Sequence, residues 1–270
     1  MKSINLSIII VNYNTPELVY NCIKSIKEHA ALSYEIIVVD NGSKEELRIQ
    51  NSELNKLQTA NCKLLTLEKN LGFGTGNNVG AKKATGEYLL LLNSDALVVD
   101  DSIDKMHQFM AGHDEVGALT CLLYNDIKCT KMQKYFYGNF QSLGSLTIRR
   151  YNYQKINLSQ EFFYTDIVTG ACFLIKRKFY EELGGFDEKI FMYLEDDDLC
   201  KRIIDKGYQN AVLNTAKIAH LEGKSVKNNS QRKKLYYDSQ TYFWNKHYGF
   251  WATLIMRIVR WPIKILKTNK

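Results

Sequence analysis

Proline is nearly absent from this 270-residue chain, which contains only Pro16 and Pro262, and no low-complexity stretch interrupts it. A chain of this length lies at the upper edge of a single domain. We therefore expect one large domain over residues 1–225 and a helical tail over residues 226–270, with no boundary between two large domains. Hydrophobic residues make up 45% of the sequence, which is enough for a sizeable core.

The six cysteines lack the spacing of a metal site, and no two of them form a Cys-x-x-Cys pair. This usage favours reduced thiols and therefore a cytoplasmic compartment. The N-terminal apolar run is too short for a signal peptide, and no small-residue cleavage site follows it. The net charge of +7 fits anionic partners such as nucleotide diphosphates, lipid headgroups or nucleic acid, and does not choose among them.

The chain is organised around Tyr88–Val99, with the sequence YLLLLNSDALVV. Four consecutive leucines predict a strand buried on both faces, as at the centre of a parallel sheet. The strand ends at Asn93, Ser94 and Asp95, and ligands of open α/β sheets bind beyond the carboxyl ends of the strands. Asp95 is therefore placed to hold a metal ion that holds a diphosphate, or else it caps a turn or a helix.

Two further strands are predicted over Leu6–Val11 and Glu35–Val39, with a helix between them. This order implies a right-handed crossover and parallel pairing. Asn12 and Asp40, which follow the two strands, should then emerge at the same edge of the sheet. Asp40 can accept hydrogen bonds from a ribose or a base, although a turn residue before Asn-Gly is the simpler interpretation.

A glycine-rich segment over residues 70–80 follows a third predicted strand, Cys62–Leu67, and leads into a helix predicted over Asn77–Ala84. Its spacing matches neither a Rossmann GxGxxG motif nor a P-loop. Glycine lets the backbone approach a ligand closely, and a helix N-terminus suits phosphate. The glycines can equally serve tight turns alone.

The second half of the chain contains an acidic cluster, Glu195–Asp198, in the first turn of a predicted helix. The helix dipole tolerates acids there, and Asp198 can pair with Arg202 one turn later. This structural explanation accounts for Glu195 and Asp196 less well. A carboxylate at such a position can act as a general base that takes the proton of an attacking hydroxyl group. Residues 125–161 show weak periodicity and predict no clear structure.

In this order and at these spacings, the segments SIIIVNYNT, EIIVVDNGS, NLGFGTGNNVG and LLNSDA resemble family 2 glycosyltransferases, most of all the rhamnosyltransferase branch. The resemblance implies an α/β fold of the GT-A type, with a mostly parallel central sheet flanked by helices and a C-terminal helical extension. It implies an inverting transferase that moves L-rhamnose from dTDP-rhamnose to a saccharide or a polyprenyl-diphosphate-linked acceptor in cell-surface polysaccharide synthesis, with no nucleic-acid partner.

Three alternatives stay open. One is a glycosyltransferase with a UDP-hexose donor, and another is a nucleotide-sugar-binding, membrane-associated module without transfer activity. The acidic cluster argues against such a module, because a pure binder needs no base. A nucleotidyltransferase is the third, but Asn12-Tyr13-Asn14 supplies no glycine-rich, basic motif at the first strand.

The resemblance also implies residue roles. Asp196 is the expected catalytic base, with its neighbour Glu195 as the alternative. Mg²⁺ or Mn²⁺ is expected at Asp95 and at His220, which begins an HxxGxS motif. Asn93 replaces the first Asp of the family's Asp-x-Asp motif and removes one charge. Donor contacts are expected from Val11, Asn12, Asn14, Asp40, Asn41, Gly42, Asn70, Gly72, Phe73, Asn77, Asn78, Asn93, Ser94 and Asp95. The acceptor side is expected at Thr169, Gly170, Asp187 and Asp198.

These roles require Asp95, Asp196 and His220 to converge on a single cleft, although they lie far apart in the sequence.

The tail reads as a polar-aromatic helix over residues 231–248 and, beyond Gly249, an apolar and basic segment over residues 250–267. At 100° per residue its basic side chains form one stripe: Arg257, Arg260, Lys264 and Lys267. The segment has too many charges to span a bilayer, and it resembles an interfacial helix. We expect it to attach the protein to the inner face of the cell membrane. Packing on the globular body, or a contact in a homodimer, is the alternative.

Overall fold

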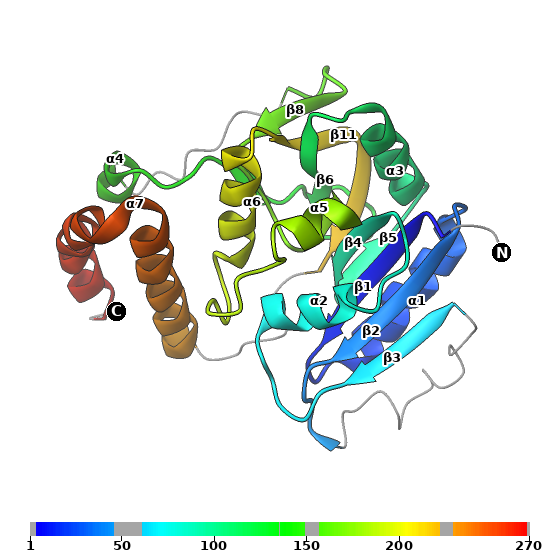
Figure 1. Cartoon of the computed structure of the whole chain (residues 1–270), viewed down its shortest axis with the longest axis horizontal. Coiled ribbons are helices and arrows are strands. Elements are labelled where there is room, and N and C mark those ends of the chain that lie inside the picture. The colour runs from blue at the N-terminus through cyan, green and yellow to red at the C-terminus, as the bar shows by residue number, and fades with distance from the viewer. Residues whose placement is uncertain (1–3, 46–60, 135, 149–156, 222–228, 269–270) are drawn as a thin grey trace.

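The computed structural model describes residues 4–45, 61–134, 136–148, 157–221 and 229–268. In the first half, apolar runs form the strands, and helices lie between most of them (Figure 1). The elements are β1 Leu6–Asn12, α1 Pro16–His29, β2 Tyr34–Asp40, β3 Cys62–Thr66, α2 Phe73–Ala81, β4 Tyr88–Asn93, β5 Ala96–Val98 and α3 Ser102–Gly112.

The second half adds the long strands β6 and β11, several shorter strands and helices, and the long C-terminal helix α7. Its elements are β6 Val116–Tyr124, β7 Tyr137–Gly138, α4 Leu143–Ile148, β8 Phe162–Thr165, β9 Ile167–Val168, β10 Cys172–Lys176, α5 Arg177–Glu182, α6 Glu195–Asp205, β11 Gln209–His220 and α7 Asn229–Thr268. The predicted α/β class is therefore confirmed.

Across the described residues, one nine-stranded sheet has the order β3-β2-β1-β4-β10-β6-β11-β5, and β8 also pairs with β11. Strands β3, β2, β1 and β4 are parallel, as predicted, and β6 is parallel to β11. The sheet is mixed in its second half, because β10, β5 and β8 run antiparallel to their neighbours. Helices α1, α2, α3 and α6 pack against this sheet.

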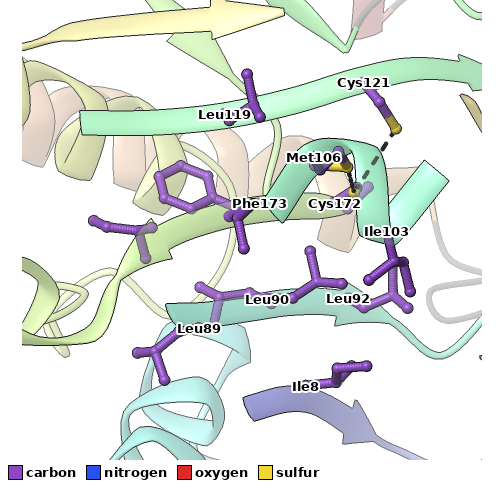
Figure 2. Packing of buried hydrophobic residues seen from close by; sticks show 14 of the residues in the cluster. Ile8, Leu89, Leu90, Leu92, Ile103, Met106, Leu119, Cys121, Cys172 and Phe173 are labelled. Carbon is purple, nitrogen blue, oxygen red and sulfur yellow. Dashed lines mark hydrogen bonds between the residues drawn. The ribbon is translucent and has the colours of Figure 1, made fainter. Parts of the chain in front are cut away.

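The leucine strand β4 lies at the centre of the core. Leu89, Leu90, Leu91 and Leu92 are at most 1% exposed, which confirms a strand buried on both faces. Figure 2 shows Cys172 of β10 next to this strand, with its sulfur 4.0 Å from the sulfurs of Cys121 and Met106. All six cysteines are free thiols.

One predicted boundary was wrong: helix α2 begins at Phe73, not at Asn77, so most of the glycine-rich segment is helical. Strand β4 ends at Asn93, as predicted, and the chain then turns at Ser94 and forms β5, which joins the far edge of the sheet beside β11. Strand β11 has a register shift between Leu213 and Lys217.

Helix α7 consists of two helical segments that meet at Gly249, where φ is 82° and the backbone leaves helical geometry. Arg260 of the second segment donates to the carbonyl of Tyr237 and to the side chains of Gln240 and Thr241 in the first, so the segments fold against each other (Figure 1). We call this unit the C-terminal hairpin. No helix in the described part of the chain is long and apolar enough to cross a bilayer.

Candidate active site

The ends of three neighbouring strands bring together polar residues predicted to bind the donor. Parallel register places Asn12 at the end of β1 opposite Asp40 at the end of β2, and Val11 opposite Asn93 at the end of β4. The expectation that these residues share one edge of the sheet is therefore confirmed. Val11 is half-buried and lies close to Gly76 of α2. A Cβ at Gly76 would lie 3.0 Å from Val11 Cγ1.

Asn12 and Asp40 are almost fully buried, with exposures of 0% and 1%. The side-chain nitrogen of Asn12 donates to Asp40 Oδ1 at 3.4 Å and to Ser43 Oγ at 3.1 Å, and its side-chain Oδ1 accepts from the backbone N–H and the hydroxyl group of Thr15. Asn14 accepts from the backbone N–H of Lys44 at 2.9 Å. The three side chains therefore fix the loops beyond β1 and β2 against each other. Their contact with a donor stays a prediction.

Asn41 ties the loop after β2 to the segment that begins α2. Its amide nitrogen donates to Asn70 Oδ1 at 3.1 Å and to the carbonyl of Gly72 at 3.0 Å, and its Oδ1 accepts from Leu71 N–H. Gly72 has φ of 91°, and a Cβ there would lie 2.3 Å from the carbonyl oxygen of Phe191. At Gly42, where φ is 71°, a Cβ would lie 2.3 Å from the Lys69 backbone. These glycines serve close contacts between backbone segments.

Two asparagines of α2 are turned into the protein. The Asn78 oxygen accepts from Tyr180 Oη at 2.6 Å and from Phe186 N–H at 2.9 Å, and its nitrogen donates to Phe186 and Glu188. Every hydrogen-bonding position of Asn78 is therefore used within the protein, and its contact with a donor stays a prediction. Asn77 is 1% exposed and donates to the carbonyl of Phe73.

Asp95 and His220, the two predicted metal ligands, are in contact. Asp95 follows β4, and His220 ends β11, which pairs with β5. His220 Nε2 lies 3.2 Å from Asp95 Oδ1 and 3.1 Å from the amide nitrogen of Asn93. Gln133 lies on the other side of the ring, with Nε2 3.2 Å from His220 Nδ1 and 2.7 Å from its carbonyl oxygen. Ser94 lies 3.3 Å from Thr15.

This donor set suits a divalent cation in part. A carboxylate and an imidazole are both ligands of Mn²⁺, and Gln133 fixes the orientation of the ring as the second shell of a metal site does. Asn93 adds a neutral amide where a second carboxylate would have added a charge. No group of three or more His, Cys, Asp or Glu side chains that could hold a metal occurs among the described residues. Asp95 and His220 would therefore supply two protein ligands to such a cation. The rest of the HxxGxS motif, residues 222–225, lies outside the described residues.

The acidic cluster opens α6, as predicted, and its first two carboxyl groups differ in exposure. Asp196 is half-buried, and its Oδ2 accepts the backbone N–H of Gly170 at 3.0 Å. Burial raises the pKa of Asp196 above its ordinary value, although this bond and the N–H of Asp197 oppose the effect. Glu195 is 6% exposed, and its Oε2 has no hydrogen-bond partner. Burial, and then the charge of Asp196, raise the pKa of Glu195 well above its ordinary value.

The other predicted acceptor-side residues divide into two groups. Thr169 and Gly170 lie beside Asp196, and a Cβ at Gly170 would lie 3.8 Å from Asp196 Oδ2. Asp198, in contrast, is 0% exposed and contacts Arg202, Lys246 and His247. Asp187 accepts from Tyr242 and from Lys246. Asp198 is therefore buried instead of facing an acceptor, and its predicted pairing with Arg202 is confirmed.

The residues around Gly170 connect three parts of the candidate site. They contact the start of α2, the acidic cluster, and the end of β4, next to the Asp95–His220 pair. A Cβ at Gly170 would lie 3.0 Å from the ring of Phe73, the first residue of α2. The next residue, Ala171, accepts the backbone N–H of Asn93 at 3.0 Å. Asp196 and the end of β4 therefore contact adjacent residues of the segment 169–171.

Sequence reasoning missed three residues that shape this site. Gln133 lies in the segment without periodicity, so no pattern indicated that it contacts His220. Lys246 and His247 belong to a polar helix whose sequence gives no sign that it reaches α6. Only their position in the folded chain brings these side chains to the site.

Comparison with known families decides the affiliation of the chain. The family model described as Glycosyl transferase family 2 matches residues 7–184, which is more than half of the 270-residue chain. The chain belongs to glycosyltransferase family 2. A second family model, described as the N-terminal domain of galactosyltransferase, matches residues 158–224 of this family 2 chain, the part that contains the acidic cluster and His220.

Individual relatives of this family 2 chain are distant. An uncharacterized glycosyltransferase of Haemophilus influenzae is 26% identical over 131 residues, which cover 48% of this chain and 42% of that protein. The chain covers less than half the length of each curated relative compared.

Solved structures show the same fold. The crystal structure of GalNAc-T7 with UDP, GalNAc and Mn²⁺ has a TM-score of 0.68 at 17% identity, covering 90% of this chain and 51% of that one. The mannosyltransferase PcManGT from Pyrobaculum calidifontis, in complex with GDP-Man and Mn²⁺, has a TM-score of 0.60 at 17% identity, covering 94% of this chain and 73% of that one.

Proposed function

We propose that this chain is an inverting glycosyltransferase that moves a sugar from a nucleoside-diphosphate donor to a hydroxyl group of an acceptor. The observation that carries the proposal is that Asp196 accepts from Gly170, while Asn93, which contacts the His220 of the Asp95–His220 pair, bonds to the next residue, Ala171. Family membership supports it, as do nucleotide and Mn²⁺ in two structures of the same fold.

In this mechanism Asp196 accepts the proton of the acceptor hydroxyl group as its oxygen bonds to the anomeric carbon. The bond from that carbon to the diphosphate breaks on the opposite face, and the diphosphate leaves with the electron pair. The backbone N–H groups of Gly170 and Asp197 hold the two oxygens of the Asp196 carboxylate. Asp95 and His220 would hold a divalent cation, which when bound offsets the charge of the leaving diphosphate.

The finer proposal is that the donor is dTDP-rhamnose and the acceptor a saccharide or a polyprenyl-diphosphate-linked saccharide of cell-surface polysaccharide. The support is the motif resemblance, including Asn93 in place of an aspartate. A UDP-hexose is the alternative donor.

A panel of dTDP-rhamnose, UDP-glucose, UDP-galactose and GDP-mannose tests this proposal by nucleotide release with a lipid extract as acceptor. We expect release from dTDP-rhamnose that exceeds release from the other donors and falls when EDTA removes the metal. Preferential release from a UDP-hexose would reassign the donor and retain the transfer reaction. Binding of a donor without release of nucleotide from any of them would favour the non-catalytic module.

We also propose that the C-terminal hairpin attaches the protein to the inner face of the cell membrane. One face of its second segment carries large apolar side chains that are 39% to 74% exposed: Phe250, Trp251, Leu254, Ile255 and Ile258. No acidic residue occurs in residues 250–270, and Arg257 is exposed on the same segment. An apolar face with basic neighbours suits an anionic lipid surface. Arg260 departs from the predicted basic stripe, because its guanidinium contacts the first segment of the hairpin.

A further inference from the structure

The turn that leads into α6 has an unusual backbone. Tyr193 and Leu194, immediately before Glu195, both have positive φ values, 68° and 63°. Such conformations are unfavourable for residues other than glycine, and they persist where surrounding contacts hold them. Leu194 also precedes the first turn of α6 without a capping side chain. The position of the acidic cluster therefore depends on what packs against this turn.

The C-terminal hairpin provides that packing. Leu194 is 5% exposed and belongs to a small apolar cluster with Phe243, Trp244 and Met256 of the hairpin. Ser239, also from the hairpin, donates to the carbonyl of Met192 at 2.8 Å. Residues of α7 thus fix Leu194 and also Met192, which precedes Tyr193. These α7 residues lie more than forty positions later in the sequence.

Polar contacts from the same helix hold the other end of the turn. Asp198 Oδ1 lies 2.7 Å from His247 Nε2 and 2.7 Å from Lys246 Nζ, and its Oδ2 accepts from Arg202 at 2.9 Å. Burial would raise the pKa of Asp198, but His247, Arg202 and Lys246 together lower it to about 2. Lys246 also contacts Asp187, which extends the network to the loop before the acidic cluster.

We propose that His247 and Lys246 are positioning residues that orient Asp196 by holding Asp198, its neighbour in the first turn of α6. This inference rests on the proposed role of Asp196 as the base. Neither residue forms a hydrogen bond with Asp196. The carboxylate of Asp196 instead accepts hydrogen bonds from the backbone N–H groups of Gly170 and Asp197. Because Asp196 and Asp198 share one helical turn, loss of the contacts at Asp198 frees the turn to shift and moves the carboxylate away from the acceptor hydroxyl group.

Steady-state kinetics with the preferred donor test the proposal. We expect His247→Leu to lower kcat by about tenfold or more, with the KM for the donor changed by less than about threefold, because the interaction lost affects the reacting geometry more than donor binding. His247→Gln, which keeps a hydrogen-bond donor, should recover most of kcat. Lys246→Met should also lower kcat, whereas Lys234→Met, at an exposed lysine of the same helix, should leave it unchanged.

A double-mutant cycle separates positioning from general damage to the fold. In an Asp198→Asn background, His247→Leu should have little further effect on kcat, since the two residues act through one contact. An unchanged kcat for His247→Leu, or losses that multiply independently in the double variant, would overturn the inference. If His247→Leu does not fold, the comparison of Lys246→Met with Lys234→Met decides. A wild-type chain that transfers no sugar would instead refute the proposed function.

Discussion

Two adjacent carboxyl groups, Glu195 and Asp196, have different surroundings although they follow one another in the chain. Glu195 is buried, with one oxygen that has no hydrogen-bond partner, and burial and the charge of Asp196 raise its pKa well above its ordinary value. Asp196 is more accessible and is oriented by Gly170. The sequence could place both in one motif, but only burial distinguishes a base from its neighbour.

We therefore expect Asp196→Asn to lower kcat by about 10²-fold to 10⁴-fold, the range for removal of a general base. Donor affinity, measured by calorimetry, should stay within a small factor of that of the wild-type chain. Glu195→Gln, the matched control, changes a buried side chain that is less accessible to an acceptor than Asp196, and it should cost much less activity. The reverse order of the two effects would assign the base to Glu195.

The pH dependence of kcat/KM provides a second test of Asp196. The base works only when ionised, so activity rises as pH increases through its pKa. Because burial raises this pKa above the ordinary value of 3.8, the acid limb of the profile should lie above pH 3.8. The profile should be measured over a range in which the fold is intact by circular dichroism. An acid limb at or below pH 3.8 would show that a different group titrates.

At the level of secondary-structure elements, the parallel strands β1, β2, β3 and β4 could be predicted because their apolar runs have a clear length and order. Predictions failed where distant contacts decide the outcome. Helix α2 includes the glycine-rich segment because Phe73 N–H bonds to the carbonyl of Phe191, more than a hundred residues away in the sequence. Strand β5 leaves β4 to pair with β11, and no local pattern encodes that pairing.

Gly72 offers a direct test of the contact between the start of α2 and the loop before the acidic cluster. Gly72→Ala adds a methyl group 2.3 Å from the Phe191 carbonyl oxygen, at a φ of 91°. Gly207 has a similar φ of 89° and nothing within 4 Å of an added Cβ, so Gly207→Ala carries the backbone cost alone.

We expect Gly207→Ala to lower the free energy of unfolding by about 1 kcal/mol. Gly72→Ala should cost about 1–3 kcal/mol more, because the overlap with Phe191 is added. Chemical denaturation measures both variants under the same conditions. Equal losses would mean that the loop at Phe191 moves aside easily and does not fix the start of α2.

At the scale of the whole molecule, the C-terminal hairpin connects a surface to the candidate active site. Its inward side contacts Leu194 and Asp198, next to the acidic cluster, and its second segment exposes an apolar face. The sequence predicted an amphipathic tail, but it did not predict that this tail packs against α6. No local sequence pattern around Phe243 and His247 indicates which residues they contact. A protein held by this face would have the site close to a lipid-linked acceptor.

Vesicle sedimentation tests the membrane proposal. We expect the wild-type chain to sediment with vesicles that contain phosphatidylglycerol and to bind less at high salt, because basic side chains contribute to the attraction. The double variant Phe250→Ser with Trp251→Ser should bind much more weakly, since its two most exposed aromatic anchors are lost. Ile127→Ser, at an equally exposed apolar residue outside the hairpin, should bind like the wild-type chain. The contrary outcome is a wild-type chain that stays in the supernatant when the vesicles are removed, while analytical ultracentrifugation shows it to be a dimer and the double variant to be a monomer. In that case the apolar face joins two copies of the chain and the membrane proposal is wrong.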